Sequence, residues 1–227
     1  EYPAPTPEYP APTPEYPAPT PTPPPVVHVV ITPDSLGWGL KVPKPTIVSD
    51  SPSLCGLCLS TSLRASGTGK DVFKFPGAPL LGIKLSSIQT MTYWTKKTTP
   101  AGSSAVDWFL QIYTAGGARI QAEPYLASQV TEQSGEWALW QSAADAASDA
   151  LPNSLNWGDS SGGDFGPNLG SWSDVLGNAA LADQRVTQFT FTTGSGWADG
   201  FEGLISTVEV GLSSGAKVIA DFAESPA

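Results

Sequence analysis

The side chains that could carry out chemistry are few and scattered along this chain of 227 residues. His28 is the only histidine, and its place inside a run of valines is typical of a packed core or edge imidazole. A nucleophilic serine or cysteine needs a base beside it, and a single histidine inside a valine run offers no such pairing in the sequence. Glycoside hydrolysis needs two carboxylates at a set separation. We expect no enzyme, although carboxylates distant in sequence can still meet in space; the candidates are Glu123, Glu136, Glu202 and Glu209.

Cysteine and acidic residues suggest two further kinds of site. Cys55 and Cys58 are the only cysteines, too few ligands for a zinc site, and they lack the strand–helix context of a redox motif. We expect a small structural disulfide that fixes the local shape of a loop, with reactive thiols as the alternative. Asp159, Asp164 and Asn168 could offer oxygens to Ca²⁺. A flexible polar loop explains them equally well, and we predict no metal ion and no cofactor.

Three of the eight tryptophans lie near predicted loops, where an exposed ring could stack on a sugar: Trp137, Trp140 and Trp157. Trp137 and Trp140 are three positions apart, so a regular strand sends them to opposite faces of its sheet. At most one of the two could then lie in the core with the other on the surface. Trp94 and Trp108 follow an apolar alternation and are predicted to lie in the core.

These side chains are expected to lie on strands, because the hydrophobic period beyond Pro25 is two. The pattern predicts an all-β, jelly-roll-like sandwich of two sheets. One short helix is predicted over 171–181, with Ser171 as its N-cap and Asp174 three residues on, and a shorter helical turn over 142–150. Residues 158–168 read as a long mobile loop. The predicted strands are 26–31, 72–75, 88–94, 106–113, 118–122, 136–141, 185–192, 204–212 and 216–222.

The first 25 residues form a separate segment ahead of the domain at 26–227. EYPAPTP occurs three times in succession, and 12 of the 23 prolines fall here. Polyproline II needs no internal hydrogen bonds, and at about 3.1 Å per residue this segment would reach roughly 75 Å. Seven residues make two turns plus one third, so each repeat turns its side chains by about 120°. Such a rod suits a coat on every side better than docking along one groove.

The coat we expect is O-linked sugar, since no N-x-Ser/Thr sequon occurs. An uncoated linker is the alternative. The attachment candidates are Thr6, Thr13, Thr20 and Thr22, or, if hydroxylated, Pro3, Pro5, Pro7, Pro10, Pro12, Pro14, Pro17, Pro19 and Pro21.

Charge and hydropathy exclude some partners. The net charge of −10 disfavours nucleic acid, and no stretch is long and apolar enough to span a bilayer. The chain begins at Glu rather than Met, which indicates either a removed signal peptide or a fragment of a longer repeat array.

The order of several motifs resembles a β-sandwich domain of secreted bacterial proteins over about residues 29 to 224. That resemblance implies a jelly-roll-like fold with an adhesive or carbohydrate-associated role, and the cysteine pair and the rod depart from its pattern. The rod resembles hydroxyproline-rich, extensin-like glycoproteins and the repeats of sugar-coated extracellular fibrils. The motifs are TPDSLGWGL, IQTMTYW, VDWFLQIYT, AEPYL, GEWALWQS, SWSDVL, TFTTGSGWADGFEGLISTVEVGL and IADFAE.

These observations favour a secreted structural subunit of a fibre or surface appendage, whose partners are other copies of itself and covalent O-glycans. The segment after the rod is either the domain's own first strand or a strand that completes a neighbour's sheet. A carbohydrate-binding or adhesin module on a stalk is the alternative function. The candidate assembly strand is Val26, Val27, His28, Val29, Val30 and Ile31.

Overall fold

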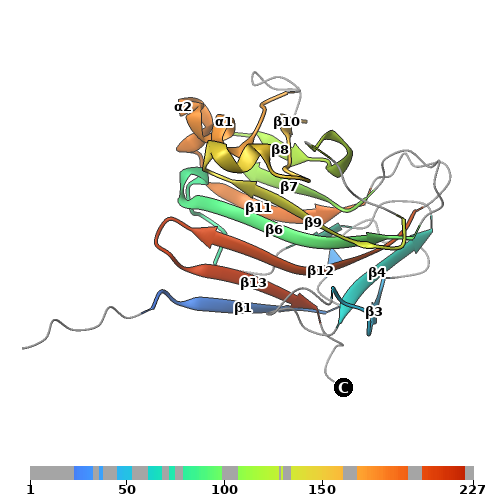
Figure 1. The fold of residues 1–227 in the computed structure, drawn as a ribbon. Helices are drawn as coiled ribbons and strands as arrows, with labels where there is room; N and C mark the ends of the chain where they lie inside the picture. Colours follow the sequence, from blue (N-terminus) through green and yellow to red (C-terminus); the bar gives the residue numbers. More distant parts are fainter. Residues whose placement is uncertain are drawn as a thin grey trace, which may run out of the picture.

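The structure is a computed structural model that confirms the all-β sandwich: two sheets lie face to face, with short helical segments beside them (Figure 1). Residues 1–22, which carry every predicted glycosylation site, lie outside the described residues, as do Cys55 and Cys58. No helix among the described residues is long and apolar enough to cross a membrane. The described ranges are 23–32, 36–37, 45–52, 61–67, 72–74, 79–98, 107–127, 129, 134–160, 168–193 and 201–222.

The larger sheet is built around its longest strand, β12. One side of β12 pairs with β6, which pairs in turn with β9. Its other side is shared between β13 and β4. All these pairs are antiparallel, and only the outermost pair, β1 with β13, is parallel. The strands are β1 (Val26–Ile31), β3 (Thr46–Val48), β4 (Ser62–Gly67), β6 (Ile88–Lys97), β9 (Trp137–Ala143), β12 (Phe201–Leu212) and β13 (Lys217–Phe222).

The smaller sheet has the order β10-β8-β7-β11-β5-β2 and is antiparallel throughout. Its edge strand β10 pairs with β8 alone among the described strands, and an isolated antiparallel bridge joins Trp157 on its other flank to Gly170. The strands are β2 (Leu36–Gly37), β5 (Val72–Lys74), β7 (Phe109–Thr114), β8 (Arg119–Ala122), β10 (Trp157–Asp159) and β11 (Val186–Thr192).

The core lies between the sheets, and β6 shows how the inward face is chosen. Tyr93 is fully buried, lies between Trp140 and Val208 of the neighbouring strands, and meets the ring of Phe191 edge-on at 4.9 Å. The next residue, Trp94, therefore faces outward and is only partly buried. The prediction of a core position was thus wrong for Trp94.

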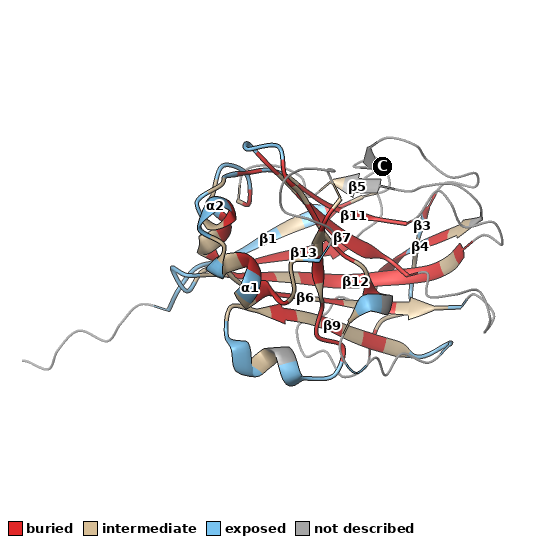
Figure 2. Ribbon diagram, turned by 90° about the horizontal axis from the view of Figure 1, so that it is seen from above, coloured by how far each residue is buried: buried red, intermediate tan, exposed pale blue. Residues whose placement is uncertain are grey.

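The same prediction is confirmed for Trp108, which is fully buried. Buried residues follow the central strands in Figure 2, whereas β1 is mostly exposed.

The predicted helix is present but broken into α1 (Trp172–Gly177) and α2 (Ala179–Ala182). Ser171 caps α1 in a reciprocal capping box with Asp174, as the sequence predicts. Asn178 is extended, and its side chain accepts from Ala180 N, so it starts a second helix. Single-turn 3₁₀ helices are η2 (Leu85–Ser87), η3 (Pro124–Leu126) and η4 (Ala146–Ala150), the last within the predicted helical turn.

One surface ion pair ties η2 to α2. Lys84 Nζ donates to Asp183 Oδ1 at 2.6 Å, and this hydrogen bond and the ammonium charge lower the pKa of the Asp183 carboxyl.

Candidate functional site

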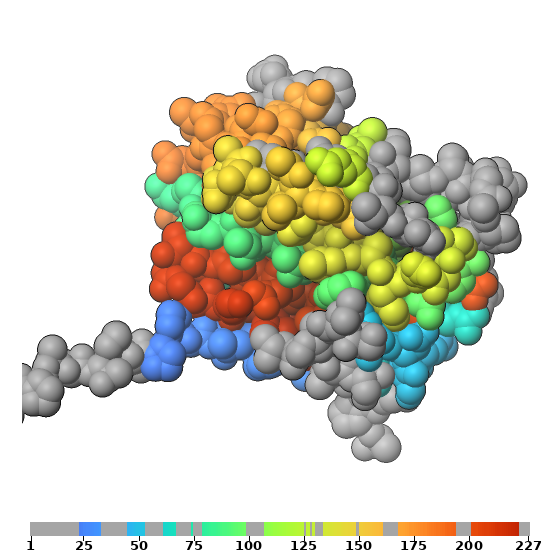
Figure 3. Space-filling view, in the orientation of Figure 1, coloured from blue at the N-terminus to red at the C-terminus, as the bar shows by residue number. Residues whose placement is uncertain are grey.

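The strand β1 forms an exposed edge of the larger sheet, along the lower rim of the molecule (Figure 3). Val26, Val27 and Val30 expose 50%, 39% and 55% of their surface. They are three of the six large hydrophobic residues that are exposed among the described residues. An exposed apolar strand edge is a template for pairing with another chain. This edge is therefore the first candidate site.

Few side chains hold β1 on its neighbour. Ile31 is fully buried beside Phe222, and Val29 packs against the core beside Ala220. The rest of the attachment is the parallel backbone ladder, which runs along the whole strand. Such a strand can detach and pair again without disrupting most of the core.

One polar contact fixes the register of β1. The Nδ1 atom of His28 lies 2.8 Å from Oδ2 of Asp221 on β13. The Asp221 side chain is 6% exposed, whereas that of His28 is 56% exposed. Oδ1 of Asp221 is buried and has no hydrogen-bond partner among the described residues. A buried carboxylate is costly unless it is paired, so a register shift that removed His28 would be unfavourable. His28 is thus an edge imidazole with a structural partner.

The Pro-rich segment joins the domain at the β12–β13 turn. Lys217 N donates to Pro25 O at 3.1 Å, and Gly215 lies in this turn with φ of +82°. A Cβ atom on Gly215 would lie 2.8 Å from Cγ of Pro24. Glycine is needed here both for the positive φ and for the close approach of the proline. The last prolines before β1 are therefore seated on the domain.

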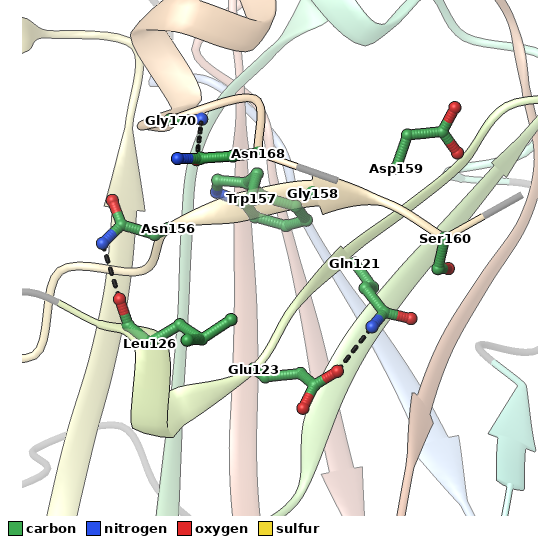
Figure 4. A pocket seen from close by; sticks show the side chains of 10 residues that line it. All are labelled: Gln121, Glu123, Leu126, Asn156, Trp157, Gly158, Asp159, Ser160, Asn168 and Gly170. Atoms are coloured by element: carbon green, nitrogen blue, oxygen red, sulfur yellow. Dashed lines mark hydrogen bonds between the residues drawn. The ribbon is translucent and has the colours of Figure 1, made fainter. Parts of the chain in front are cut away.

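The second candidate site is a pocket of about 590 Å³ beside the edge strand β10 (Figure 4). Its walls come from β8, β10, η3 and the segment that precedes α1. A pocket of this volume lies within the usual range for small-molecule sites. It is lined by Gln121, Glu123, Leu126, Asn156, Trp157, Gly158, Asp159, Ser160, Asn168 and Gly170.

A chain of hydrogen bonds orients one wall of the pocket. Tyr113 Oη donates to Oε1 of Gln111 at 3.3 Å, and Nε2 of Gln111 donates to Oε1 of Gln121 at 2.9 Å. Nε2 of Gln121 then donates to Oε1 of Glu123 (Figure 4). Each glutamine accepts a hydrogen bond from one neighbour through its oxygen and donates to the next through its nitrogen. These bonds fix the orientation of both amide groups. The Glu123 carboxylate ends this chain at the pocket wall.

The opposite walls are fixed by local contacts. Asn156 Nδ2 donates to Leu126 O at 2.6 Å, and Asn168 Oδ1 accepts from Gly170 N at 3.2 Å. Asp159 Oδ1 accepts from Arg119 N at 3.3 Å. Amides and carboxylates therefore reach the pocket from several elements, with donors and acceptors mixed.

The structure places the three candidate sugar-stacking tryptophans differently. Trp140 is fully buried and its Nε1 donates to Thr95 Oγ1 at 2.7 Å. Trp157 is 1% exposed, donates to Ser142 Oγ at 2.8 Å, and packs against Trp172 at 4.8 Å between ring centroids. Neither ring has a free face for stacking, so that interpretation is corrected for both.

Trp137 alone of the three keeps a partly exposed ring. Its Nε1 donates to Asp50 Oδ1 at 3.2 Å, and it lies on the same outer face of the larger sheet as Trp94. Trp137 and Trp140 do lie on opposite faces, as their spacing predicts.

The predicted acidic candidates are only partly brought together. Glu123, Asp159 and Asn168 line the pocket, whereas Asp164 lies outside the described residues. Glu202 pairs with Arg64, Glu209 pairs with Lys217, and Glu136 is exposed in a turn. Glu123 and Asp159 therefore both line one pocket, but the Asp159 carboxylate is directed away from Glu123 (Figure 4). No group of three or more metal-ligating His, Cys, Asp or Glu side chains occurs in the part of the chain that the structure describes.

Sequence reasoning missed Gln121, Asn156 and Ser160 as pocket residues. Gln121 reaches the site because β8 pairs with β10 at Gly158. No local motif marks such a pairing, because its partners are more than thirty positions apart.

Comparison with models of protein families gives no match for this chain, and a search of curated proteins gives none either. The functional proposal is therefore built on the residues themselves.

Proposed function

We propose that the protein is a structural subunit of an extracellular fibre or surface appendage, in which β1 of one subunit completes the larger sheet of the next. The observation that supports this proposal is the placement of β1. It is a parallel strand added to an otherwise antiparallel sheet, and three of its valines are exposed. It also directly follows the Pro-rich segment.

Exchange of β1 between subunits costs little in contact energy. The same ladder to β13, the same burial of Ile31 and the same His28–Asp221 contact form whether β1 comes from its own chain or from a neighbour. Protein concentration and the connection after β1 then decide between the two arrangements. Because each subunit gives one strand and accepts one, the contact is heterologous and head-to-tail.

The connection after β1 is short. β1 ends at Ile31 in the larger sheet and β2 begins at Leu36 in the smaller sheet, so four residues join the two sheets. Four residues reach about 13 Å when extended. Short hinges are the kind that invite exchange of a terminal strand between subunits. This hinge would also hold exchanged neighbours close together.

The Pro-rich segment would project from each junction as a sugar-coated rod. The seating of Pro24 and Pro25 on the β12–β13 turn supports a fixed exit from the domain. The 120° advance per repeat spreads threonines around the rod axis, which suits O-glycans on every side. A secreted location follows from the same proposal.

Sedimentation velocity over a range of protein concentrations tests this function. We expect multimers that grow with concentration, because the exchange is a mass-action equilibrium. Intact-mass spectrometry of the same secreted preparation tests whether the rod is glycosylated. We expect mass increases in steps of one sugar residue, carried on residues 1–25. A single unmodified species of 23.6 kDa at every concentration would contradict the proposal.

A further inference from the structure

We propose that the pocket beside β10 binds a neutral sugar unit. This inference does not depend on strand exchange, since the pocket is built from β8, β10, η3 and the segment before α1, and contains no residue of β1. The sugar would be a ligand of the folded domain, separate from the glycans proposed on the rod.

The charges of the lining residues select a neutral ligand. Among the described residues, Glu123 and Asp159 are the only charged ones that line the pocket, and both are acidic. No lysine, arginine or histidine is among the ten lining residues. The Arg119 guanidinium donates to Ser160 Oγ and Ser160 O, so one cation stands beside two carboxylates, and the remaining negative charge disfavours an anion such as phosphate or sulfate.

The hydrogen-bonding groups match a ring that carries several hydroxyls. A hydroxyl both donates and accepts, so it is best met by paired acceptors and donors. Carboxylates accept only and amides do both, whereas the Ser160 hydroxyl already donates to Arg119 O and accepts from Arg119 Nε. Glu123 supplies a carboxylate and Asn156 an amide, and the two lie on different walls of the pocket (Figure 4).

The acceptor at Glu123 is oriented before any ligand arrives. The carboxylate is held through Gln121 and Gln111, and Gln111 is only 3% exposed. An acceptor fixed in this way loses little side-chain freedom on binding. Its second oxygen, Oε2, can accept from a ligand hydroxyl while Oε1 keeps its bond to Gln121.

An apolar surface lies beside the polar groups. Leu126 on η3 lines the pocket and exposes 51% of its surface. A sugar ring has a C–H face as well as hydroxyls, and this face can cover a leucine that is otherwise open to water. Polar walls with one exposed apolar side chain therefore fit a sugar better than a fully polar ion or a fully apolar ligand.

Saturation-transfer NMR on the full chain tests this inference. The probes are neutral hexoses, neutral pentoses and their disaccharides at about 10 mM, a concentration that saturates a site with Kd near 1 mM. We expect transfer to at least one neutral sugar and none to inorganic phosphate. Binding should weaken about tenfold or more in Glu123→Ala, which removes a charged hydrogen-bond acceptor.

The matched control is Glu136→Ala, because Glu136 is exposed and does not line the pocket. This variant should bind as the unaltered chain does. Leu126→Ser is the second variant, and weaker binding is expected because it removes the apolar surface while leaving the polar walls. Thermal unfolding of each variant shows whether the domain remains folded. Lack of transfer to every neutral sugar, or equal binding by Glu123→Ala and Glu136→Ala, would overturn the inference.

Discussion

Removal of residues 1–32 is expected to leave a domain that binds β1 as a separate peptide. The truncation uncovers the edge of β13 and the site that buries Ile31. Burial of an isoleucine side chain contributes about 1.5–3 kcal/mol, and the backbone ladder adds to it. We therefore expect the truncated domain to lose a few kcal/mol of unfolding free energy and to regain most of it when the peptide of residues 23–32 is in excess. Urea denaturation with and without peptide measures both effects.

The control peptide carries Ile31→Asp, which would bury an unpaired charge and should restore nothing. A second peptide with Val27→Asp changes an exposed residue of the same strand, opposite Val218. It should bind nearly as well as the unaltered sequence. If the truncated domain is as stable as the full chain and ignores all three peptides, β1 contributes nothing to the sheet and cannot be the assembly strand.

Replacement of Trp140 by alanine is expected to lower the free energy of unfolding by about 3–5 kcal/mol. The side chain is fully buried, and its Nε1 donates to Thr95, whose hydroxyl in turn donates to the buried carboxylate of Asp107. The substitution leaves a large cavity and removes one member of a buried polar network. Urea denaturation of the full chain measures the loss.

Trp137→Ala is the matched control, because Trp137 lies three residues earlier on the same strand and faces outward. Its loss removes a partly exposed ring and one hydrogen bond to Asp50, so we expect a cost of about 1 kcal/mol. Equal costs for the two substitutions would mean that the inward face of β9 has been assigned incorrectly. Loss of sugar binding in Trp140→Ala would report unfolding, since that ring is inside the core.

The sequence predicts the layers of this fold better than it predicts which face of a strand points inward. Runs rich in β-branched and aromatic residues, bounded by Gly, Pro and Ser clusters, place β6, β7, β11, β12 and β13 close to their positions. In β6 the alternation is ambiguous, since threonines occupy both faces and aromatic residues occur side by side at Tyr93 and Trp94. Cross-strand partners resolve it: Trp140 and Val208 flank Tyr93.

The helix break shows a similar limit. The apolar spacing from Trp172 onward is helical over two turns, and it predicts one helix. Asn178 interrupts it because its side chain caps the backbone of the next turn. The spacing of apolar residues does not reveal a local hydrogen bond of this kind, although the bond can end a helix that the spacing predicts.

The two candidate sites also differ in how far sequence could reveal them. β1 is a contiguous run of β-branched residues beside the prolines, so both its strand character and its exposed position are local properties. The pocket joins residues 121–126 to 156–160 and 168–170 through strand pairing and a turn. Only four of its residues were candidates beforehand: Glu123 for glycoside hydrolysis, Trp157 for sugar stacking, and Asp159 and Asn168 for Ca²⁺.

Disulfide trapping of β1 against β13 tests the central claim most directly. Val26→Cys and Lys217→Cys lie opposite each other in the parallel ladder, and both positions are exposed. Neighbouring strands are about 4.8 Å apart, a spacing that a disulfide can bridge. The double variant is oxidised at high protein concentration and run on a non-reducing gel. The Val26→Cys and Lys217→Cys single variants run beside it as controls, because they show any crosslinks that arise from Cys55 and Cys58.

Strand exchange predicts a ladder of covalent multimers in the double variant alone, which collapses to monomer on reduction. A closed monomer with an internal bond, at concentrations where the full chain would be assembled, would contradict the claim that β1 links one subunit to the next.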